Sequence, residues 1–202
     1  MQSTEFTLMR HARTHWNLEH RIQGQTDTIL APEGQKQAEA WANALRPGRY
    51  DRILASDLRR AVATAEAIRR RVGGALDFDS RLREQDWGEW VGLTLCRIVN
   101  DHRKEFQSQS RRGWDFTPPG GESRSRVLQR ASEALRDAAE RFSGQRILVV
   151  THQGVIKCLL YHLVGHDMLP GGKKPLERDR LHRLRLDEDG FSLVSLNKEF
   201  VP

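Results

Sequence analysis

Apolar and polar positions follow one another along this chain with two periods, one typical of strands and one typical of helices. Short apolar runs predict buried strands at residues 6–10, 52–55 and 146–151, with a weaker strand at 75–79. Apolar side chains spaced i, i+3, i+4 and i+7 predict helices at residues 32–45, 58–72, 93–106, 126–142 and 155–164. Strands that alternate with helices favour an α/β fold, a three-layer α/β/α sandwich with a mostly parallel central sheet.

Polar residues at helix starts and turns set the ends of these elements. Ser56 or Asp57 is expected to cap the second helix and Ser123 the fourth, because short polar side chains accept hydrogen bonds from the first free N–H groups. The chain closes with two short runs, at residues 181–186 and 191–196, joined by an acidic turn that contains glycine. We expect these runs to form a C-terminal antiparallel hairpin on the edge of the sheet.

Length and composition are those of one folded unit. The chain has 202 residues, of which 38% are hydrophobic, and we expect a single domain over residues 1–202. No window approaches the roughly 18 apolar residues that a transmembrane helix requires, so we expect no membrane partner. Cys96 and Cys158 stand apart in predicted helices, where we expect both to be packing residues, and a reducing, cytoplasmic location fits this cysteine usage.

The excess of positive charge leaves several kinds of partner open. A formal net charge of +6 would suit nucleic acid, an acidic membrane surface or an anionic small molecule. The basic runs at residues 69–71 and 111–112 are short and have no aromatic residues among them, so solvated helix ends and loops explain them better. We therefore expect no nucleic-acid partner, and an anionic small molecule as the substrate.

The first strand leads into a pair of residues suited to binding and attacking a phosphate. Arg10 presents a fork of donors that matches phosphate oxygens, and His11 offers a lone pair when its ring is neutral. A neighbouring positive charge favours that neutral form. The pair suits phosphoryl transfer to a histidine, although two such residues more often simply end a strand.

Three further residues follow the other predicted parallel strands. His152 comes directly after strand 146–151, Glu84 follows the weak third strand, and Arg60 lies in the first turn of the helix after the second strand. A cation is unfavourable at a helix N-terminus unless an anion binds there; taken alone, Arg60 is equally well explained as a surface arginine. Because ligands of open α/β sheets bind beyond the carboxyl ends of the strands, we expect these residues to converge with His11.

These motifs resemble those of the histidine phosphatase superfamily, the phosphoglycerate-mutase-like phosphatases, over nearly the whole chain. Five separated motifs occur in the order of that family: Arg10-His11 with Thr14 and Asn17, continued by Gln23-Gly24; Ser56-Asp57-Leu58-Arg59-Arg60-Ala61; Leu82-Arg83-Glu84; Pro119-Gly120-Gly121-Glu122-Ser123; and Thr151-His152. Their number and order make the resemblance highly specific. The fourth motif is similar to the substrate loop of the family.

The resemblance implies a phosphomonoester hydrolase that acts on a small phosphorylated metabolite through a phosphohistidine intermediate. His11 would be the phosphorylated residue, and Glu84 would donate a proton to the leaving oxygen. The transferring phosphoryl group would be held by Arg10, Arg60 and His152. Further substrate contacts are expected from Asn17, Gln23, Gly24 and Gln153. No metal and no cofactor is expected, and a homodimer is compatible with this assignment.

Three positions depart from the usual pattern of that family. Ala12 stands where glycine is usual beside the nucleophile, and a residue with a Cβ restricts the backbone there. Ala31-Pro32 replaces a threonine or serine lead-in to the helix, and Gln153 stands where a glycine commonly follows the second histidine. We expect these changes to affect the shape of the pocket more than its chemistry.

Three other interpretations compete with the phosphatase. A zinc site could use His11 with His15. The same helical spacing separates His162 from His166, but no carboxylate or cysteine completes either pair. A phosphate-binding protein without catalysis would keep the fold, yet every chemical position carries a competent residue. A mutase of this family usually has a longer insertion than residues 93–117, which favours the phosphatase.

Overall fold

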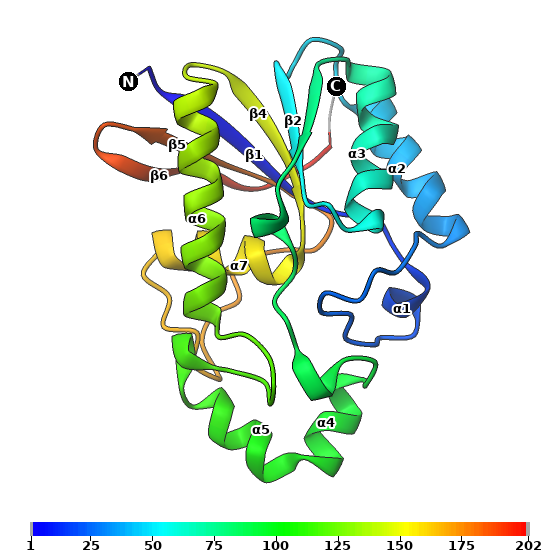
Figure 1. The fold of residues 1–202 in the computed structure, drawn as a ribbon, viewed down its shortest axis with the longest axis vertical. Helices are drawn as coiled ribbons and strands as arrows, with labels where there is room; N and C mark the ends of the chain where they lie inside the picture. Colours follow the sequence, from blue (N-terminus) through cyan, green and yellow to red (C-terminus); the bar gives the residue numbers. More distant parts are fainter. Residues whose placement is uncertain (1, 201–202) are drawn as a thin grey trace.

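The computed structural model describes residues 2–200, and strands and helices alternate in it as the hydrophobic pattern predicts (Figure 1). Six strands of this region form one sheet in the order β3-β2-β4-β1-β5-β6. Their bounds are β1 (Thr4–Arg10), β2 (Arg52–Ala55), β3 (Ala75–Phe78), β4 (Arg146–Thr151), β5 (Leu181–Asp187) and β6 (Gly190–Lys198). The first four strands are parallel, whereas β5 and β6 form the antiparallel hairpin at the edge.

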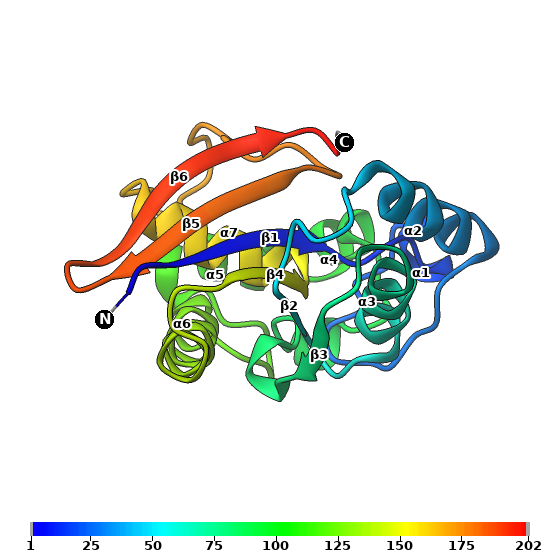
Figure 2. The ribbon, with the colours of Figure 1, turned by 90° about the horizontal axis from the view of Figure 1, so that it is seen from above.

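Helices cover both faces of the sheet and the region beyond its strand ends (Figures 1 and 2). One face carries α2 (Pro32–Ala44) and α3 (Arg59–Val72), and the other carries α6 (Arg124–Arg141) and α7 (Gln153–Leu163). The shorter elements are α1 (His15–Leu18), α4 (Leu95–Asp101), α5 (Arg103–Ser110) and the 3-10 turns Ser80–Leu82, Gly88–Trp90 and Gly113–Asp115. Within the described residues, no helix has both the length and the apolar character to span a membrane.

The alternation of side chains along β4 explains the three layers. Ile147 and Val149 belong to a core cluster with residues of α6 and α7, while Leu148 and Val150 join a second cluster with residues of α2 and α3. All four side chains are fully buried. Because both faces of the strand are covered, its sequence is a continuous apolar run. The predicted three-layer α/β/α sandwich with a C-terminal hairpin is confirmed.

A third, smaller core lies beyond the strand ends, beneath α4 and α5. Trp90, Ile98 and Phe116 are buried there, with Trp87 and Phe106 packed against them. This aromatic cluster fixes α4 and α5 to the loop that follows Glu84. The two helices therefore form a stable wall beside the sheet edge.

One of the two predicted helix caps is right and the other is wrong, and one predicted helix is divided in two. The hydroxyl of Ser123 accepts a hydrogen bond from the N–H of Arg126 at 3.2 Å, so the predicted cap of α6 is confirmed. The helix expected over 93–106 is instead two helices, α4 and α5, which meet at His102. The break follows a run of weak helix formers, residues 100–102.

The expected cap of α3 by Ser56 or Asp57 is wrong. Leu58 occupies the capping position, and the carboxylate of Asp27, on a distant loop, accepts a hydrogen bond from the N–H of Arg59 at 2.7 Å. The packing prediction for the cysteines holds for Cys158, which is buried, but not for the exposed Cys96 on α4; both are free thiols.

Candidate active site

The parallel strands bring the predicted residues to one edge of the sheet. β1 and β4 pair in register, with Arg10 beside Thr151, so the residues that follow them lie side by side. The N–H of His11 donates to the carbonyl of Thr151 at 2.9 Å, and the ring centroids of His11 and His152 are 5.1 Å apart. β2, on the other side of β4, leads into α3 and hence to Arg60. Strand pairing alone therefore places the two histidines together.

His11 is buried as a neutral imidazole of one defined tautomer. Its Nδ1 lies 2.7 Å from the carbonyl oxygen of Ala12, which can only accept, so Nδ1 carries the proton and Nε2 keeps the lone pair. Burial, together with the charges of Arg10 and Arg60, lowers the pKa of His11 well below its usual 6.5. His11 therefore presents an unprotonated Nε2 at neutral pH.

His152 is also buried and neutral. Its Nε2 lies 2.9 Å from the hydroxyl of Ser56, which in turn accepts a hydrogen bond from the N–H of Leu58 at 3.4 Å. Burial, and then the charge of Arg60, lowers the pKa of His152 well below 6.5. Ser56 thus holds the ring at one nitrogen, and the other nitrogen has no hydrogen-bond partner among the described residues.

Arg60 is fully buried, which rules out the surface arginine considered above. Its Nη1 donates to the carbonyl of Thr26 at 2.7 Å and its Nη2 to that of Gly24 at 2.8 Å. Burial lowers the pKa of this guanidinium to about 10. Carbonyls of the loop before α2 therefore hold the arginine in place, and no carboxylate of residues 2–200 forms an ion pair with it.

Three polar atoms of this cluster are buried without a hydrogen-bond partner among the described residues. They are Nε of Arg10, Nε of Arg60 and Nδ1 of His152. An unpaired buried polar group costs on the order of 1–3 kcal/mol, so three of them in one place require an explanation. Oxygen atoms of a bound anion would supply the acceptors that guanidinium groups need.

Glu84 rests on the N-terminus of α7, next to these residues. Its Oε1 accepts hydrogen bonds from the N–H groups of Gln85 at 2.9 Å and Gly154 at 3.0 Å, and its Oε2 lies 3.2 Å from the same Gly154 nitrogen. A Cβ on Gly154 would come within 2.3 Å of Oε1. The close contact between the Glu84 carboxylate and the first turn of α7 therefore depends on glycine at this position.

Arg130 of α6 fixes the segment that carries Glu84. Its Nη1 donates to the carbonyls of Arg81 and Arg83, both at 2.6 Å, and its Nη2 to that of Glu84 at 3.1 Å. The same guanidinium forms a bidentate ion pair with Glu122, at 2.7 and 2.8 Å. The Pro-Gly-Gly-Glu-Ser loop, expected to meet the substrate, thus supports the acidic segment and does not line the cavity.

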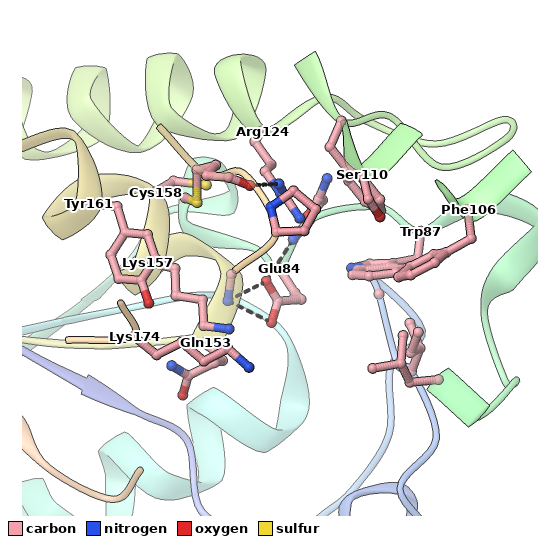
Figure 3. Close-up of a pocket in the computed structure, with 18 of the residues that line it drawn as sticks. Glu84, Trp87, Phe106, Ser110, Arg124, Gln153, Lys157, Cys158, Tyr161 and Lys174 are labelled. Atoms are coloured by element: carbon pink, nitrogen blue, oxygen red, sulfur yellow. Dashed lines mark hydrogen bonds between the residues drawn. The ribbon is translucent and has the colours of Figure 1, made fainter. Parts of the chain in front are cut away.

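A cavity of about 790 Å³ opens from this cluster towards α4 and α5 (Figure 3). Eight of the nine predicted site residues line it: Arg10, His11, Asn17, Gln23, Gly24, Arg60, Glu84 and Gln153. The ninth, His152, is fully buried beside His11 and lies outside the cavity wall.

Three residues that the sequence patterns did not predict also line the cavity: Lys157, Arg124 and Phe106. Lys157 carried a usable signal, because it is a lysine in a largely apolar stretch, one turn after Gln153. Arg124 and Phe106 carried none, because only the packing of α5 and α6 brings them to the cavity.

The three departures from the family pattern are accommodated. Ala12 is fully buried, its N–H donates to the hydroxyl of Thr64 at 3.0 Å, and its φ is not in the left-handed region that favours glycine. Pro32 is the first residue of α2, where a missing N–H costs nothing. Gln153 is the first residue of α7 and faces the cavity.

The histidine pairs considered for zinc do not converge. His11 is buried whereas His15 is exposed on α1. His166 lies beyond the end of α7, where Nδ1 accepts a hydrogen bond from the N–H of Met168 and Nε2 contacts the carbonyl of Lys173, each at 2.8 Å. Residues 2–200 contain no group of three or more His, Cys, Asp or Glu side chains placed to hold a metal ion.

Comparison with known proteins agrees with this geometry. The family model of the histidine phosphatase superfamily (branch 1) matches residues 6–199. The chain belongs to the histidine phosphatase superfamily. Among relatives of this superfamily, a probable phosphoglycerate mutase GpmB from Salmonella choleraesuis is 34% identical over 167 residues, which cover 78% of this chain and 74% of that protein.

Solved structures of other proteins share the fold along nearly the whole chain. Bacillus stearothermophilus YhfR is 29% identical, with a TM-score of 0.85 over 96% of this chain and 97% of that one. The native mycobacterial glucosyl-3-phosphoglycerate phosphatase is 28% identical, with a TM-score of 0.83 over 98% and 100%. An Entamoeba histolytica phosphoserine phosphatase mutant, solved with phosphoserine, is 26% identical, with a TM-score of 0.81 over 96% of each chain. The family expected from the sequence is confirmed, and the chain is an enzyme of this phosphatase and mutase superfamily.

The buried neutral His11 predicts a loss of stability in acid. Because its pKa is lowered by folding, the unfolded chain binds more protons below pH 6.5, and stability must fall as the pH falls from 6.5 towards the folded pKa. One such histidine contributes a slope of at most about 1.4 kcal/mol per pH unit. His11→Asn, which keeps a donor for the Ala12 carbonyl, should flatten the free energy of unfolding between pH 6.5 and 5, measured by urea titration in phosphate-free buffer.

His182 supplies the control for this measurement. It is buried on β5, away from the cavity, and burial lowers its pKa to about 4. His182→Asn should flatten the same pH dependence and leave activity towards p-nitrophenyl phosphate intact, whereas His11→Asn should abolish that activity. An unchanged slope in His11→Asn would mean that the folded protein protonates His11 like an ordinary histidine.

Proposed function

We propose that this enzyme is a phosphatase that hydrolyses small phosphomonoesters through a phosphohistidine at His11. The supporting observation is the neutral His11 ring, whose free Nε2 lies in a cluster with the unpartnered polar atoms of Arg10, Arg60 and His152. A phosphate group would give these atoms their missing acceptors and present phosphorus to the histidine.

In the first step, Nε2 of His11 forms a bond to phosphorus while the bond between phosphorus and the ester oxygen breaks. Arg10, Arg60 and His152 hold the non-bridging oxygens, on which negative charge is spread in the transition state. Glu84, in its protonated form, transfers its proton to the leaving oxygen, so that a neutral alcohol departs. The proton on Nδ1 of His11 stays there throughout and donates a hydrogen bond to the carbonyl of Ala12.

In the second step, water attacks phosphorus and the bond to Nε2 breaks. Glu84, now a carboxylate, takes the proton of the attacking water, so inorganic phosphate leaves and both residues return to their starting forms. Every role in this sequence belongs to a side chain, and neither a metal nor a cofactor has a part in it.

Two amide side chains are suited to bind the same phosphate. The Oδ1 of Asn17 accepts a hydrogen bond from the N–H of Thr14 at 3.1 Å, and the Oε1 of Gln23 accepts from the hydroxyls of Thr14 and Thr28. With their oxygens engaged, both amides have their NH₂ groups left to donate. The backbone of Gly24 and the side chain of Gln153 complete the proposed contacts on the cavity wall.

A phosphoglycerate mutase is the second candidate, because the Salmonella relative carries that name. A mutase must keep water away from the phosphohistidine. Between the acidic motif and the Glu122 loop, the ordered elements of this chain are α4, α5 and two 3-10 turns, and α4 and α5 form one wall of the cavity. We therefore favour transfer to water.

We also propose a cytoplasmic location, since Cys96 and Cys158 are free thiols, which suit a reducing compartment. Three expectations from the sequence stay predictions: a homodimer, the lack of a nucleic-acid partner, and a single domain over residues 1–202. Residues 1, 201 and 202 of that range lie outside the described residues.

A rapid-quench experiment with ³²P-labelled p-nitrophenyl phosphate tests the proposed nucleophile. The wild-type enzyme should yield a phosphoenzyme that is stable in base and labile in acid, as a phosphoramidate is. His11→Ala should yield none, and His15→Ala, which removes an exposed histidine four residues away, should yield the wild-type amount. Labelled protein in His11→Ala, or a label that is stable in acid and lost in base, would contradict the assignment of His11 as the nucleophile. Transfer of the phosphoryl group to a second substrate hydroxyl in excess of phosphate release would favour the mutase.

The proton-donor role of Glu84 predicts a dependence on the leaving group. Glu84→Gln keeps an acceptor for the Gly154 N–H, so the fold should persist, but kcat for an alkyl phosphate should fall by about 10²–10⁴. The loss for p-nitrophenyl phosphate should be much smaller, because its leaving group needs no proton. Glu89→Gln, at a carboxylate outside the cavity, should change neither rate. Equal losses on both substrates in Glu84→Gln would assign Glu84 another role.

A further inference from the structure

Lys157 is a cation of the cavity that the proposed chemistry leaves unused. It lies on α7, one turn after Gly154, and lines the cavity together with Glu84 and Gln153. Its side chain remains accessible, although the surrounding protein lowers its pKa from the usual value, chiefly through burial. The ammonium group is thus placed in a hollow, where a charge is less well hydrated than on an open surface.

The position of Lys157 relative to Glu84 places it beside the leaving group. Gly154 binds the carboxylate of Glu84, and Lys157 follows three residues later on the same side of the helix. Figure 3 shows the end of the lysine side chain directed towards Glu84 and Gln153. If Glu84 protonates the leaving oxygen, the rest of the leaving alcohol must lie within reach of this lysine.

The ammonium group of Lys157 is not paired with any carboxylate of the described residues. Among residues 2–200 it forms no hydrogen bond and no ion pair. The charged groups that act on it are three cations, Arg124, Lys174 and Arg178, and one carboxylate, that of Glu84. Glu84 loses its negative charge when it holds the proton for the leaving group. At that stage the charges that act most strongly on Lys157 are those of Arg124, Lys174 and Arg178, all of them cations.

Two arginines close to the cavity, Arg124 and Arg130, already have partners within the protein. Arg124 donates to the carbonyls of Gly113 and Met168, at 3.0 and 3.1 Å, and its guanidinium lies 4.2 Å from the ring centroid of Phe116. Arg130 is paired with Glu122. Trp87 and Phe106, which lie across the cavity from Lys157 in Figure 3, offer no charge. An anion close to Glu84 would therefore meet the unpaired ammonium group of Lys157 and not these two arginines.

We infer that Lys157 binds a second anionic group, a carboxylate or a second phosphate, on the leaving-group part of the substrate. The inference rests on the proposed function, since it takes the phosphoryl group to be held at His11. It narrows the substrate class to phosphomonoesters of hydroxy acids and to bisphosphates of small diols. Lys157 is then a specificity residue: it binds the part of the substrate that departs and has no role in the bonds that change at phosphorus.

Matched pairs of substrates test this inference. 3-Phosphoglycerate and glycerol 3-phosphate differ by a carboxylate, and propane-1,3-diol bisphosphate and 3-hydroxypropyl phosphate differ by a second phosphate. Lys157→Gln should lower kcat/KM for one or both of the doubly anionic esters by about 10- to 100-fold, the range for loss of a charge-assisted hydrogen bond. Its effect on the singly anionic esters should stay within about threefold. The substrate pair for which Lys157→Gln lowers the ratio of kcat/KM values shows whether Lys157 binds a carboxylate or a second phosphate.

Lys174→Gln is the matched control, because it removes a second lysine of the cavity wall that is not on α7. It should change the ratio of kcat/KM within each pair by less than about threefold. Equal losses on both members of each pair in Lys157→Gln, or an undiminished preference for the second anion, would overturn the inference.

Two further measurements separate this inference from the proposed function. The first is hydrolysis of p-nitrophenyl phosphate, which carries no second anion. If His11→Ala abolishes this activity, the proposed function holds, whether or not Lys157→Gln has a selective effect. The second is the Kd of each ester, measured by calorimetry on His11→Asn with and without Lys157→Gln. Because His11→Asn does not turn the esters over, these values give the contribution of the second anionic group to binding alone. Binding of a doubly anionic ester should weaken about tenfold or more when Lys157 is replaced; no selective weakening for either pair contradicts the inference.

Discussion

The site depends on keeping one imidazole uncharged beside the positive charges of two arginines. Burial and the charges of Arg10 and Arg60 both oppose protonation of His11, and the carbonyl of Ala12 holds its one proton on Nδ1. The lone pair at Nε2 is therefore available at a pH where an exposed histidine would begin to lose it. This arrangement leaves polar atoms of Arg10, Arg60 and His152 buried without hydrogen-bond partners among the described residues, which destabilises the site. A bound phosphate would supply the missing acceptors.

The fold meets this constraint through backbone geometry. Register between β1 and β4 sets the two histidines side by side, and carbonyls of the loop before α2 hold Arg60 without neutralising it. Gly154 lets the carboxylate of Glu84 rest on the start of α7, while Arg130 ties the backbone of that segment to α6. Charge and position are thus controlled by separate contacts, so the cations remain free to act on a ligand.

The sequence predicted the parts of this arrangement that local signals encode. Apolar runs and helical periods identified the sandwich, and residues that follow the strand ends were expected at one edge because parallel strands end together. Contacts between distant segments escaped prediction. Asp27 caps α3 from 32 residues away, Glu122 binds the arginine that holds the Glu84 backbone, and Arg124 and Phe106 reach the cavity only through the packing of α5 and α6. None of these leaves a periodic pattern in the chain.

The protonation state of His11 is the most direct test of this account. Long-range ¹H–¹⁵N NMR of histidine-labelled protein in phosphate-free buffer reports, for each ring, which nitrogen carries the proton, and His11→Asn identifies the signal. The account predicts that His11 stays neutral from pH 7.5 to 5.5, with its proton on Nδ1 throughout. Titration of His11 near pH 6.5, or a proton on Nε2 in the neutral form, would contradict it.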